Sequence, residues 1–316
     1  MKIVIQDDYQ NCIRSLDCFE KVKHHDVTIY NDSVKDIDSL VNRFKDAEAI
    51  VLIRERTIIN AALLDKLPRL KVISQTGKVA PHIDLEACKA RGITVMDGRG
   101  SGAATAELTM LLILAGLRNL VQECNRMQQG LWQGTLGRQL KGKTLGIYGY
   151  GRIGEQVANI SKAFGANVVI WGRDNSCQKA MKDGFQIAHN KEEFFSKCDV
   201  ISLQLRLTED TKSIVSLEDL SLMKSTALLV NTSRAELIAP NALVQALKMG
   251  QPGYAAVDVY EHEPILNHSN PLTQLPNCLC SPHIGFVEKD NYEAYFGIAF
   301  DNINHYCNGN PQNLVV

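Results

Sequence analysis

Three glycines at the spacing Gly-x-Gly-x-x-Gly are the residues of this chain whose chemistry is easiest to infer. Gly149, Gly151 and Gly154 stand between an apolar segment typical of a strand, residues 144–148, and a segment typical of a helix, residues 155–164. The first glycine permits a tight turn, the second lets the backbone approach a ligand, and the third lets the helix pack closely on the sheet. Free N–H groups at the start of such a helix bind phosphate. The pattern therefore predicts a site for the pyrophosphate of a dinucleotide.

Three charged or titratable side chains stand at or beyond the ends of later strand-like segments. Arg234 lies in Asn-Thr-Ser-Arg, Glu263 in Glu-His-Glu-Pro and His283 in Ser-Pro-His-Ile-Gly. Taken singly, an arginine at a strand end is usually a solvated charge, a glutamate before proline usually lies in a loop, and a lone histidine is usually structural. Ligands of open parallel sheets bind beyond the carboxyl ends of the strands, so these three residues are candidates for a shared site.

The elements that must position these residues alternate between strand and helix along the chain. After the glycine turn we expect strands at residues 167–171, 200–205, 227–231, 254–257 and 278–280, and helices at 216–223 and 241–249. Before it we expect strands at 3–5, 27–29, 49–52 and 72–74, and helices at 40–44, 61–67 and 85–90. Apolar runs of this kind imply parallel sheets that helices cover on both faces. The predicted fold class is α/β, with a Rossmann-type doubly wound parallel sheet and a smaller flavodoxin-like α/β domain.

Chain length and a glycine-rich patch predict where the domains divide. A chain of 316 residues is too long for one compact core and suits two domains. The patch at residues 97–102 precedes a long apolar helix and is the expected hinge. A helix at about residues 291–307 would cross back and cover the first domain. We therefore expect a dinucleotide-binding domain at 98–285, and a discontinuous substrate-binding domain made of 1–97 and 286–316.

The composition argues against several classes of protein. A net charge of −1 provides no electrostatic footprint for nucleic acid or for an anionic membrane. The longest apolar run, residues 108–117, is too short to cross a bilayer and is expected to be a buried core helix. The nine cysteines lack the spacing of a zinc site, so we expect no metal and reduced thiols. Residues 1–6 are strand-like and lack the features of a signal peptide, so we expect a cytoplasmic protein.

Four motifs, taken together and in order, resemble the D-isomer-specific 2-hydroxyacid dehydrogenases. They are GYGRIG at 149–154, NTSRAELI at 231–238, AAVDVYEHEP at 255–264 and SPHIG at 281–285. The likeness is strong from residue 141 to residue 285 and looser outside. It implies an enzyme that transfers a hydride between a nicotinamide cofactor and a small 2-oxo acid or D-2-hydroxy acid, in a cleft between the two domains.

The resemblance also implies a role for each matching residue. Arg234 would bind the substrate carboxylate and carbonyl oxygen, because a guanidinium offers a fork of donors. His283 would be the general acid in reduction and the base in oxidation, and Glu263 beside it would favour the protonated ring. The backbone near Lys78 and Val79 would hold the substrate carboxylate. The implied cofactor contacts are Thr105, Gly149, Gly151, Arg152, Ile153, Gly154, Thr211, Thr232 and Asp258, the last of them on the nicotinamide carboxamide.

Two positions depart from the family's usual pattern. Ala235 stands where glycine commonly follows the arginine, and Arg206 stands where proline is common. Neither change removes a catalytic group. We expect both to affect the fit around the cofactor and to leave the chemistry intact.

The end of the strand at 167–171 bears on the choice of cofactor. Family members that bind NAD carry an acidic residue there, which bonds the adenosine ribose 2′-hydroxyl. Gly172 fills that position here and Arg173 follows it, which leaves room and a counter-charge for a 2′-phosphate. A register shift of one or two residues would make Asp174 the ribose ligand, and a solvated turn at Arg173 and Asp174 is a further alternative. We expect NADP in preference to NAD.

Substrate identity and assembly rest on fewer residues. Arg54 follows a strand-like segment and resembles a basic residue that meets the substrate phosphate in D-3-phosphoglycerate dehydrogenases, although a surface turn would look the same. The Gly172–Arg173 pair instead resembles glyoxylate and hydroxypyruvate reductases, which we rank first. A dinucleotide-sensing binding protein similar to corepressors of this fold would keep Arg234, Glu263 and His283, and only turnover would exclude it. Dimers of the family form through the nucleotide domains, so we expect a homodimer that uses the helix after Thr105.

Overall fold

The computed structural model describes residues 1–316 and divides the chain into two compact units. The smaller unit comprises residues 1–101 and 288–316, and the larger unit comprises residues 102–287. The sequence placed these divisions after residues 97 and 285, a few residues earlier in each case. Adjacent strands are parallel throughout both sheets, which confirms the predicted α/β class.

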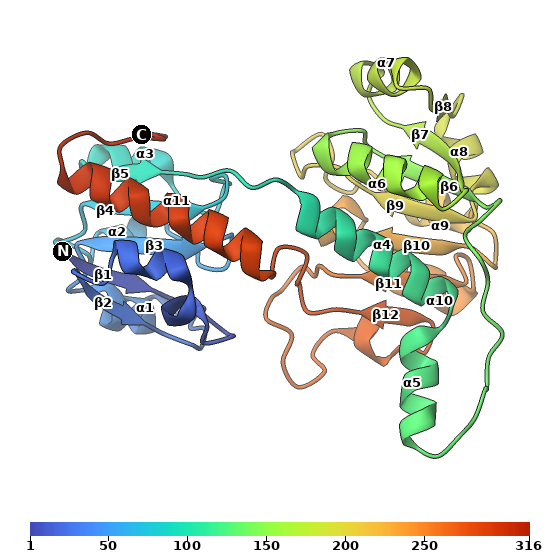
Figure 1. The fold of residues 1–316 in the computed structure, drawn as a ribbon, viewed down its shortest axis with the longest axis horizontal. Coiled ribbons are helices and arrows are strands. Elements are labelled where there is room, and N and C mark those ends of the chain that lie inside the picture. The colour runs from blue at the N-terminus through green and yellow to red at the C-terminus, as the bar shows by residue number, and fades with distance from the viewer. The chain divides into compact units, whose positions relative to one another are not determined.

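The larger unit contains a seven-stranded sheet in the order β12-β11-β10-β9-β6-β7-β8 (Figure 1). Its strands are β6 (Thr144–Tyr148), β7 (Asn167–Trp171), β8 (Gln186–Ile187), β9 (Val200–Leu203), β10 (Leu228–Asn231), β11 (Tyr254–Val257) and β12 (Cys278–Cys280). The chain enters at β6 and adds strands first on one side and then on the other, so the sheet is doubly wound. Such a reversal opens a crevice at the carboxyl ends of the two central strands, here β6 and β9.

Helices cover both faces of this sheet because successive side chains of each strand point to opposite faces. In β6, Leu145 and Ile147 pack with α4 (Ala103–Leu117) and α6 (Arg152–Ala163), whereas Tyr148 packs with α8 (Lys191–Lys197), α9 (Leu217–Ser221) and α10 (Ala242–Met249). The short α7 (Asp174–Lys182) connects β7 to β8. The 3-10 helices η3 (Ala235–Leu237) and η4 (Pro271–Gln274) lie in the loops after β10 and β11.

The apolar run at 108–117 forms most of α4, and the side chains at 109, 110, 112, 113, 115 and 117 are buried as predicted, whereas Leu111 is 55% exposed. The next helix, α5 (Leu120–Gln128), has no buried residue and projects from the end of α4 (Figure 1). No single helix is long and apolar enough to cross a membrane. Only α4 and α5 together reach that length and composition, across a bend of 64°.

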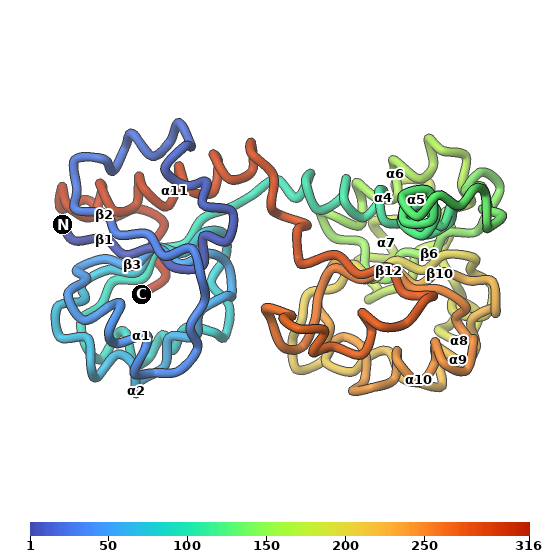
Figure 2. The backbone as a smooth tube through the Cα atoms, turned by 90° about the horizontal axis from the view of Figure 1, so that it is seen from below, coloured from blue at the N-terminus to red at the C-terminus, as the bar shows by residue number.

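The smaller unit contains a five-stranded sheet in the flavodoxin-like order β2-β1-β3-β4-β5. Figure 2 labels β1, β2 and β3 of this sheet. Its strands are β1 (Lys2–Ile5), β2 (Asp26–Ile29), β3 (Ala49–Ile53), β4 (Val72–Thr76) and β5 (Thr94–Met96). One face packs on α1 (Ile37–Phe44), α2 (Ala61–Leu64) and α3 (Leu85–Ala90). The 3-10 helices η1 (Ile13–Ser15) and η2 (Asp17–Lys21) and the long α11 (Lys289–Cys307) complete the unit.

The C-terminal helix α11 belongs to the smaller unit and packs on β4 and η2. Phe296 and Phe300 of α11 are fully buried, and their rings lie 5.7 Å apart. The hydroxyl of Ser74 in β4 donates to the Ala299 carbonyl at 2.9 Å. This helix therefore closes a core whose strands come from the other end of the sequence.

The glycine turn between β6 and α6 has the close contacts that its spacing predicts. Gly149 has a φ of +101°, and a Cβ on it would lie 2.6 Å from the Gln204 carbonyl oxygen. A Cβ on Gly154 would lie 2.3 Å from the Gly149 carbonyl oxygen. A Cβ on Gly151 would meet no atom within 4 Å. The first and third glycines are thus required by the fold itself, whereas the second leaves open space.

We predict that Gly154→Ala destabilises the larger unit by about 1–3 kcal/mol, because the added methyl group meets a backbone oxygen that cannot rotate away. Gly151→Ala is the matched control, and we expect its effect to stay within about 0.5 kcal/mol. Urea unfolding of both variants measures the difference. Equal stabilities for the two variants would contradict the close packing of α6 on the turn.

Candidate active site

The start of α6 is built to receive an anion. Gly151 is the N-cap residue of this helix and provides no capping side chain, so the first N–H groups, which include those of Ile153 and Gly154, have no capping partner. The helix has 12 residues, and its dipole adds a partial positive charge at this end. With the open space above Gly151, the turn fits the pyrophosphate of a dinucleotide. Arg152 and Ile153 lie beside Gly102 at the start of α4.

Glu263 and His283, which are 20 residues apart in sequence, meet in the loops that follow β11 and β12. The Glu263 carboxylate oxygen Oε2 lies 2.6 Å from Nδ1 of His283, and the other oxygen, Oε1, accepts the backbone N–H of Tyr260 at 2.9 Å. The two side chains are 30% and 26% exposed. Because the carboxylate occupies Nδ1, the opposite ring nitrogen, Nε2, is left to exchange a proton with a ligand.

The His283 backbone adopts a conformation that an L-residue seldom takes, with φ at +51°. Its N–H donates to the Ser281 carbonyl at 3.0 Å, and its ring meets the edge of Phe286 at 5.6 Å between centroids. Strained backbone of this kind persists where the surroundings hold it, and it is common at functional sites.

Asp258 holds this histidine loop from inside the protein. The side chain is 1% exposed, and its carboxylate accepts hydrogen bonds from the Ser281 hydroxyl at 2.6 Å, the Ile284 N–H at 2.9 Å and the Gly285 N–H at 2.8 Å. Burial raises the pKa of Asp258, while these hydrogen bonds act in the opposite direction. The structure thus assigns Asp258 a positioning role that the sequence analysis missed. Its contact with the nicotinamide carboxamide stays a prediction.

Arg234 follows β10 at the same edge of the sheet and is partly exposed. Its guanidinium donates to the Ser233 carbonyl at 2.6 Å. The buried Asn231 side chain fixes the turn, since its amide donates to the Arg234 carbonyl at 2.8 Å and its oxygen accepts the Ser233 N–H at 3.0 Å. Ala235 begins η3 and is buried, so the methyl group is accommodated where glycine is common.

The three predicted threonines bond to the protein around this edge. Thr105 on α4 donates to the Gly285 carbonyl at 3.0 Å, which ties α4 to the histidine loop. The Thr232 hydroxyl lies 2.7 Å from the Thr109 hydroxyl. The side-chain amide of Gln204, a residue that the sequence did not indicate, donates to the Thr232 hydroxyl at 3.3 Å. Thr211 is buried and donates to the Arg206 carbonyl at 2.6 Å, so its hydroxyl maintains the loop at residues 206–211.

The end of β7 carries the residues that bear on cofactor choice. Gly172 follows Trp171, and a Cβ on it would lie 3.6 Å from the Gly149 Cα. Arg173 is the N-cap residue of α7, and Asp174 is the first residue of that helix; both are exposed. A carboxylate in the first turn of a helix is favoured by the dipole, which provides a structural reason for Asp174.

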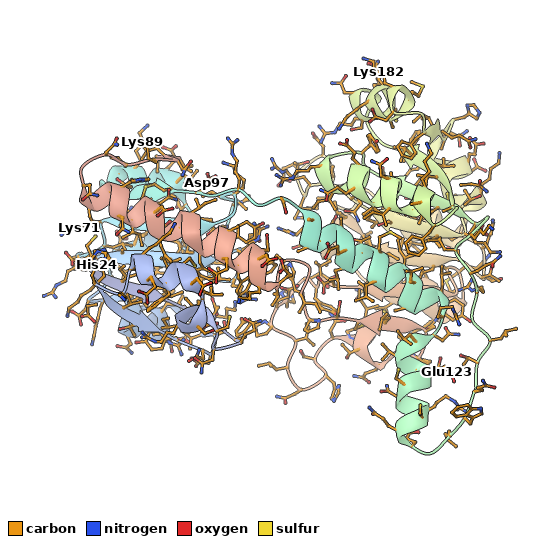
Figure 3. The ribbon with its side chains drawn as sticks, viewed as in Figure 1. His24, Lys71, Lys89, Asp97, Glu123 and Lys182 are labelled. Carbon is orange, nitrogen blue, oxygen red and sulfur yellow. The ribbon has the colours of Figure 1, made fainter.

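The remaining predicted substrate residues belong to the smaller unit. Lys78 forms an ion pair with Asp97 at 2.7 Å, and the Val79 N–H reaches the same carboxylate at 3.4 Å. Figure 3 labels Asp97 on the chain that follows β5. The backbone of Arg54 has a φ of +52°. Its guanidinium nitrogen lies 3.7 Å from a carboxylate oxygen of Glu55, and its guanidinium carbon lies 5.7 Å from the centre of the Tyr295 ring. Substrate contacts for Lys78, Val79 and Arg54 stay predictions.

Comparison with known proteins agrees with this geometry. Residues 110–285 match the family model described as "D-isomer specific 2-hydroxyacid dehydrogenase, NAD binding domain". A glyoxylate reductase of Aeropyrum pernix is 34% identical over 93% of this chain and 90% of its own length. A D-3-phosphoglycerate dehydrogenase of Methanocaldococcus jannaschii is 36% identical over 88% of this chain, but over only 53% of its own length.

A solved structure, the phosphoglycerate oxidoreductase of Vibrio cholerae, is 50% identical and covers 98% of this chain and 99% of its own, with a TM-score of 0.96. The family expected from the four motifs is therefore confirmed, and so is dependence on a nicotinamide cofactor. The chain belongs to the D-isomer-specific 2-hydroxyacid dehydrogenases, the oxidoreductases that transfer a hydride between nicotinamide and a small 2-oxo or D-2-hydroxy acid.

Proposed function

We propose that this dehydrogenase reduces glyoxylate or hydroxypyruvate and that NADPH is its preferred hydride donor. The observation that carries the proposal is the Glu263–His283 pair at 2.6 Å, beyond the same sheet edge as Arg234. The glyoxylate reductase of Aeropyrum pernix matches this chain over nearly all of both lengths and supports the substrate class.

Each proposed role follows from the chemistry of the side chain. When bound, the reduced nicotinamide supplies the hydride that adds to the carbonyl carbon. The His283 ring donates its Nε2 proton to the carbonyl oxygen, and the Glu263 carboxylate on Nδ1 orients the ring. The guanidinium of Arg234 holds the carboxylate and the carbonyl oxygen, and it opposes the negative charge that develops there. In the oxidation direction the neutral His283 accepts the proton instead.

A second candidate substrate is 3-phosphohydroxypyruvate. Two similar proteins support this candidate through the substrate in their names: the phosphoglycerate oxidoreductase of Vibrio cholerae and the D-3-phosphoglycerate dehydrogenase of Methanocaldococcus jannaschii. Arg54 provides a guanidinium for the phosphate in this case. We rank it second because the Gly172–Arg173 pair resembles the glyoxylate and hydroxypyruvate reductases.

We predict turnover when glyoxylate, hydroxypyruvate, pyruvate and 3-phosphohydroxypyruvate are each tested with NADH and NADPH, with the highest kcat/KM for one of the first two. A second prediction concerns Arg234. The Arg234→Lys variant keeps the charge and loses the planar fork, so its kcat/KM should fall at least about tenfold, equivalent to about 1.4 kcal/mol of transition-state binding. The affinity of this variant for the cofactor, measured by fluorescence titration, should be retained.

Lys248→Arg, at the exposed end of α10, is the control for a change between the two basic side chains. A preference for 3-phosphohydroxypyruvate would promote the second candidate. An Arg234→Lys enzyme within about threefold of the unmodified protein would remove Arg234 from substrate binding.

The preference for NADPH rests on Arg173, which is exposed beside Gly172 at the end of β7. A charge-assisted contact with the 2′-phosphate contributes about 1.5–3 kcal/mol, so Arg173→Ala should raise Kd for NADPH about tenfold or more. Kd for NADH, which lacks the phosphate, should change little. Lys182→Ala, at the far end of α7 and labelled in Figure 3, is the control for loss of one exposed positive charge. Equal effects of Arg173→Ala on both cofactors would favour Asp174 as the ribose ligand.

We further propose that two copies of the chain associate through the surface formed by α5 and residues 129–139. Large apolar side chains are exposed there, with Trp132 at 74% and Leu136 at 95%. Apolar patches of this kind on a soluble protein are typical of association surfaces. A second copy is the proposed partner because the surface continues from α4, the helix from which we expected the dimer.

Sedimentation equilibrium should therefore report twice the mass of one chain, and Trp132→Ser combined with Leu136→Ser should shift the equilibrium toward one chain. Leu266→Ser removes an exposed leucine outside this surface and should not change the mass. A single-chain mass for the unmodified protein at micromolar concentration would contradict the proposal.

A further inference from the structure

Two cysteine thiols face each other at the strand that leads into the histidine loop. Cys278 and Cys280 occupy the first and last positions of β12, the edge strand of the larger sheet. Residues two apart in a strand share a face, and both side chains pack against the same hydrophobic cluster. Their sulfur atoms lie 3.7 Å apart. The other seven cysteines have no role in the site described above.

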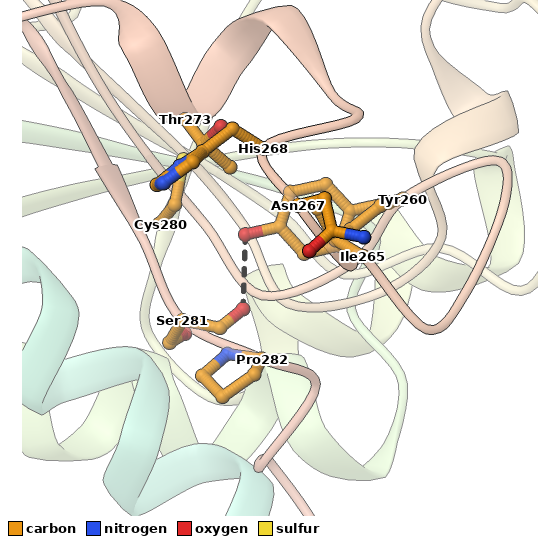
Figure 4. Close-up of a pocket in the computed structure, with 8 residues that line it drawn as sticks. All are labelled: Tyr260, Ile265, Asn267, His268, Thr273, Cys280, Ser281 and Pro282. Atoms are coloured by element: carbon orange, nitrogen blue, oxygen red, sulfur yellow. Dashed lines mark hydrogen bonds between the residues drawn. The ribbon is translucent and has the colours of Figure 1, made fainter.

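Cys280 is the thiol that small molecules can reach. It lines a cavity of about 390 Å³ together with Tyr260, Ile265, His268, Thr273 and Pro282 (Figure 4). The hydrogen bond between the two thiols lowers the pKa of Cys280, and a hydrogen bond with Tyr260 lowers it further, against the effect of burial. Cys278 shows the opposite shift, since its pKa is raised by the same thiol contact and by burial. A thiolate is the nucleophilic form of cysteine, so the two sulfurs suit different steps of one reaction.

We infer that Cys278 and Cys280 form a thiol-modification site, at which a small disulfide of the glutathione class oxidises the pair to an intramolecular disulfide. The Cys280 thiolate attacks one sulfur of the small disulfide, forms a mixed disulfide and releases one thiolate. Cys278 then loses its proton and attacks the Cys280 sulfur, which releases the second small thiol. The protein loses two electrons and two protons, and the small disulfide becomes two thiols.

The strand geometry sets the consequence of this reaction for the active site. The Cα atoms of residues two apart in a strand are about 6.6 Å apart. The Cα atoms of a disulfide are usually about 4.4–6.8 Å apart, and a separation of about 5.5–6 Å is the commonest. Closing the bond therefore draws the end of β12 inward and moves Ser281. The Ser281 hydroxyl bonds to Asp258 at 2.6 Å, and its carbonyl accepts the Tyr260 hydroxyl at 3.0 Å, so the displacement reaches His283.

Peptide mass spectrometry tests the modification without reference to turnover. Trypsin releases residues 249–289 as one peptide, because no lysine or arginine lies between these ends, and Cys278 and Cys280 are its only cysteines. After incubation with oxidised glutathione and alkylation of the remaining thiols, we expect this peptide unalkylated and lighter by two hydrogen atoms. Recovery of the peptide with both cysteines alkylated overturns the inference.

Single substitutions separate the two sulfurs. In Cys278→Ser, Cys280 has no partner to resolve it and should retain one glutathione on the peptide. In Cys280→Ser, the more buried Cys278 should remain unmodified. Equal glutathionylation of both variants would contradict the assignment of Cys280 as the attacking thiol. Cys307→Ser, which removes an exposed thiol of α11, is the control and should form the same disulfide as the unmodified protein.

The second measurement is reductase activity before and after oxidation. We expect kcat/KM to fall about tenfold or more, because a displacement of the order of 1 Å in a catalytic group has effects of this size. Dithiothreitol should restore it, and Cys280→Ser, in which neither disulfide forms, should lack this reversible loss. Full activity of protein that carries the Cys278–Cys280 disulfide would overturn the coupling to His283. A protein inactive with every 2-oxo acid would refute the proposed function, while the peptide result would still decide the modification site.

Discussion

The buried carboxylate of Asp258 is the constraint on which the catalytic arrangement depends. Two of its three hydrogen bonds come from backbone N–H groups of the loop that carries His283, and the third comes from Ser281. A buried acceptor left without its donors costs about 1–3 kcal/mol, so the loop is fixed by the need to satisfy this group. The Glu263 contact then has only to orient the ring. The strained backbone of His283 is tolerated because the loop in this conformation provides the hydrogen bonds that the Asp258 carboxylate needs.

Side-chain hydrogen bonds join other elements of the larger unit in the same way. Thr105 joins α4 to the histidine loop, and Gln204 joins the end of β9 to Thr232 after β10. The carboxyl ends of these strands are thereby linked by side chains whose hydrogen bonds lead back into the sheet. Movement of a strand end at this edge reaches the catalytic loop directly, which is why the thiol pair on β12 lies in a sensitive position.

Much of this arrangement was predictable from the sequence, and the exceptions have physical causes. The strands β6, β7, β10 and β11 are short apolar runs between polar turns, so their pattern identifies them at once. The helix α7 and the strand β8 were missed because residues 173–187 carry too few apolar side chains to show clearly either the spacing of a helix or the alternation of a strand. The helix α5 was missed because none of its side chains is buried in the chain, so it lacks the apolar face of a core helix. The motifs indicated His283 and Glu263, but the bonds of Gln204 and Ser281 join strands distant in sequence, and no local pattern encodes them.

The return of the chain to its first unit has a consequence for synthesis on the ribosome. Residues 102–287 can complete their core as one continuous segment, and they emerge before α11 does. The sheet of the smaller unit is made before that segment, whereas Phe296 and Phe300 are made after it. One apolar face of that sheet therefore lacks the helix that covers it while the whole larger unit is being translated. An exposed apolar surface of this kind is a substrate for chaperones, so the nascent chain needs protection at this sheet until α11 has been made.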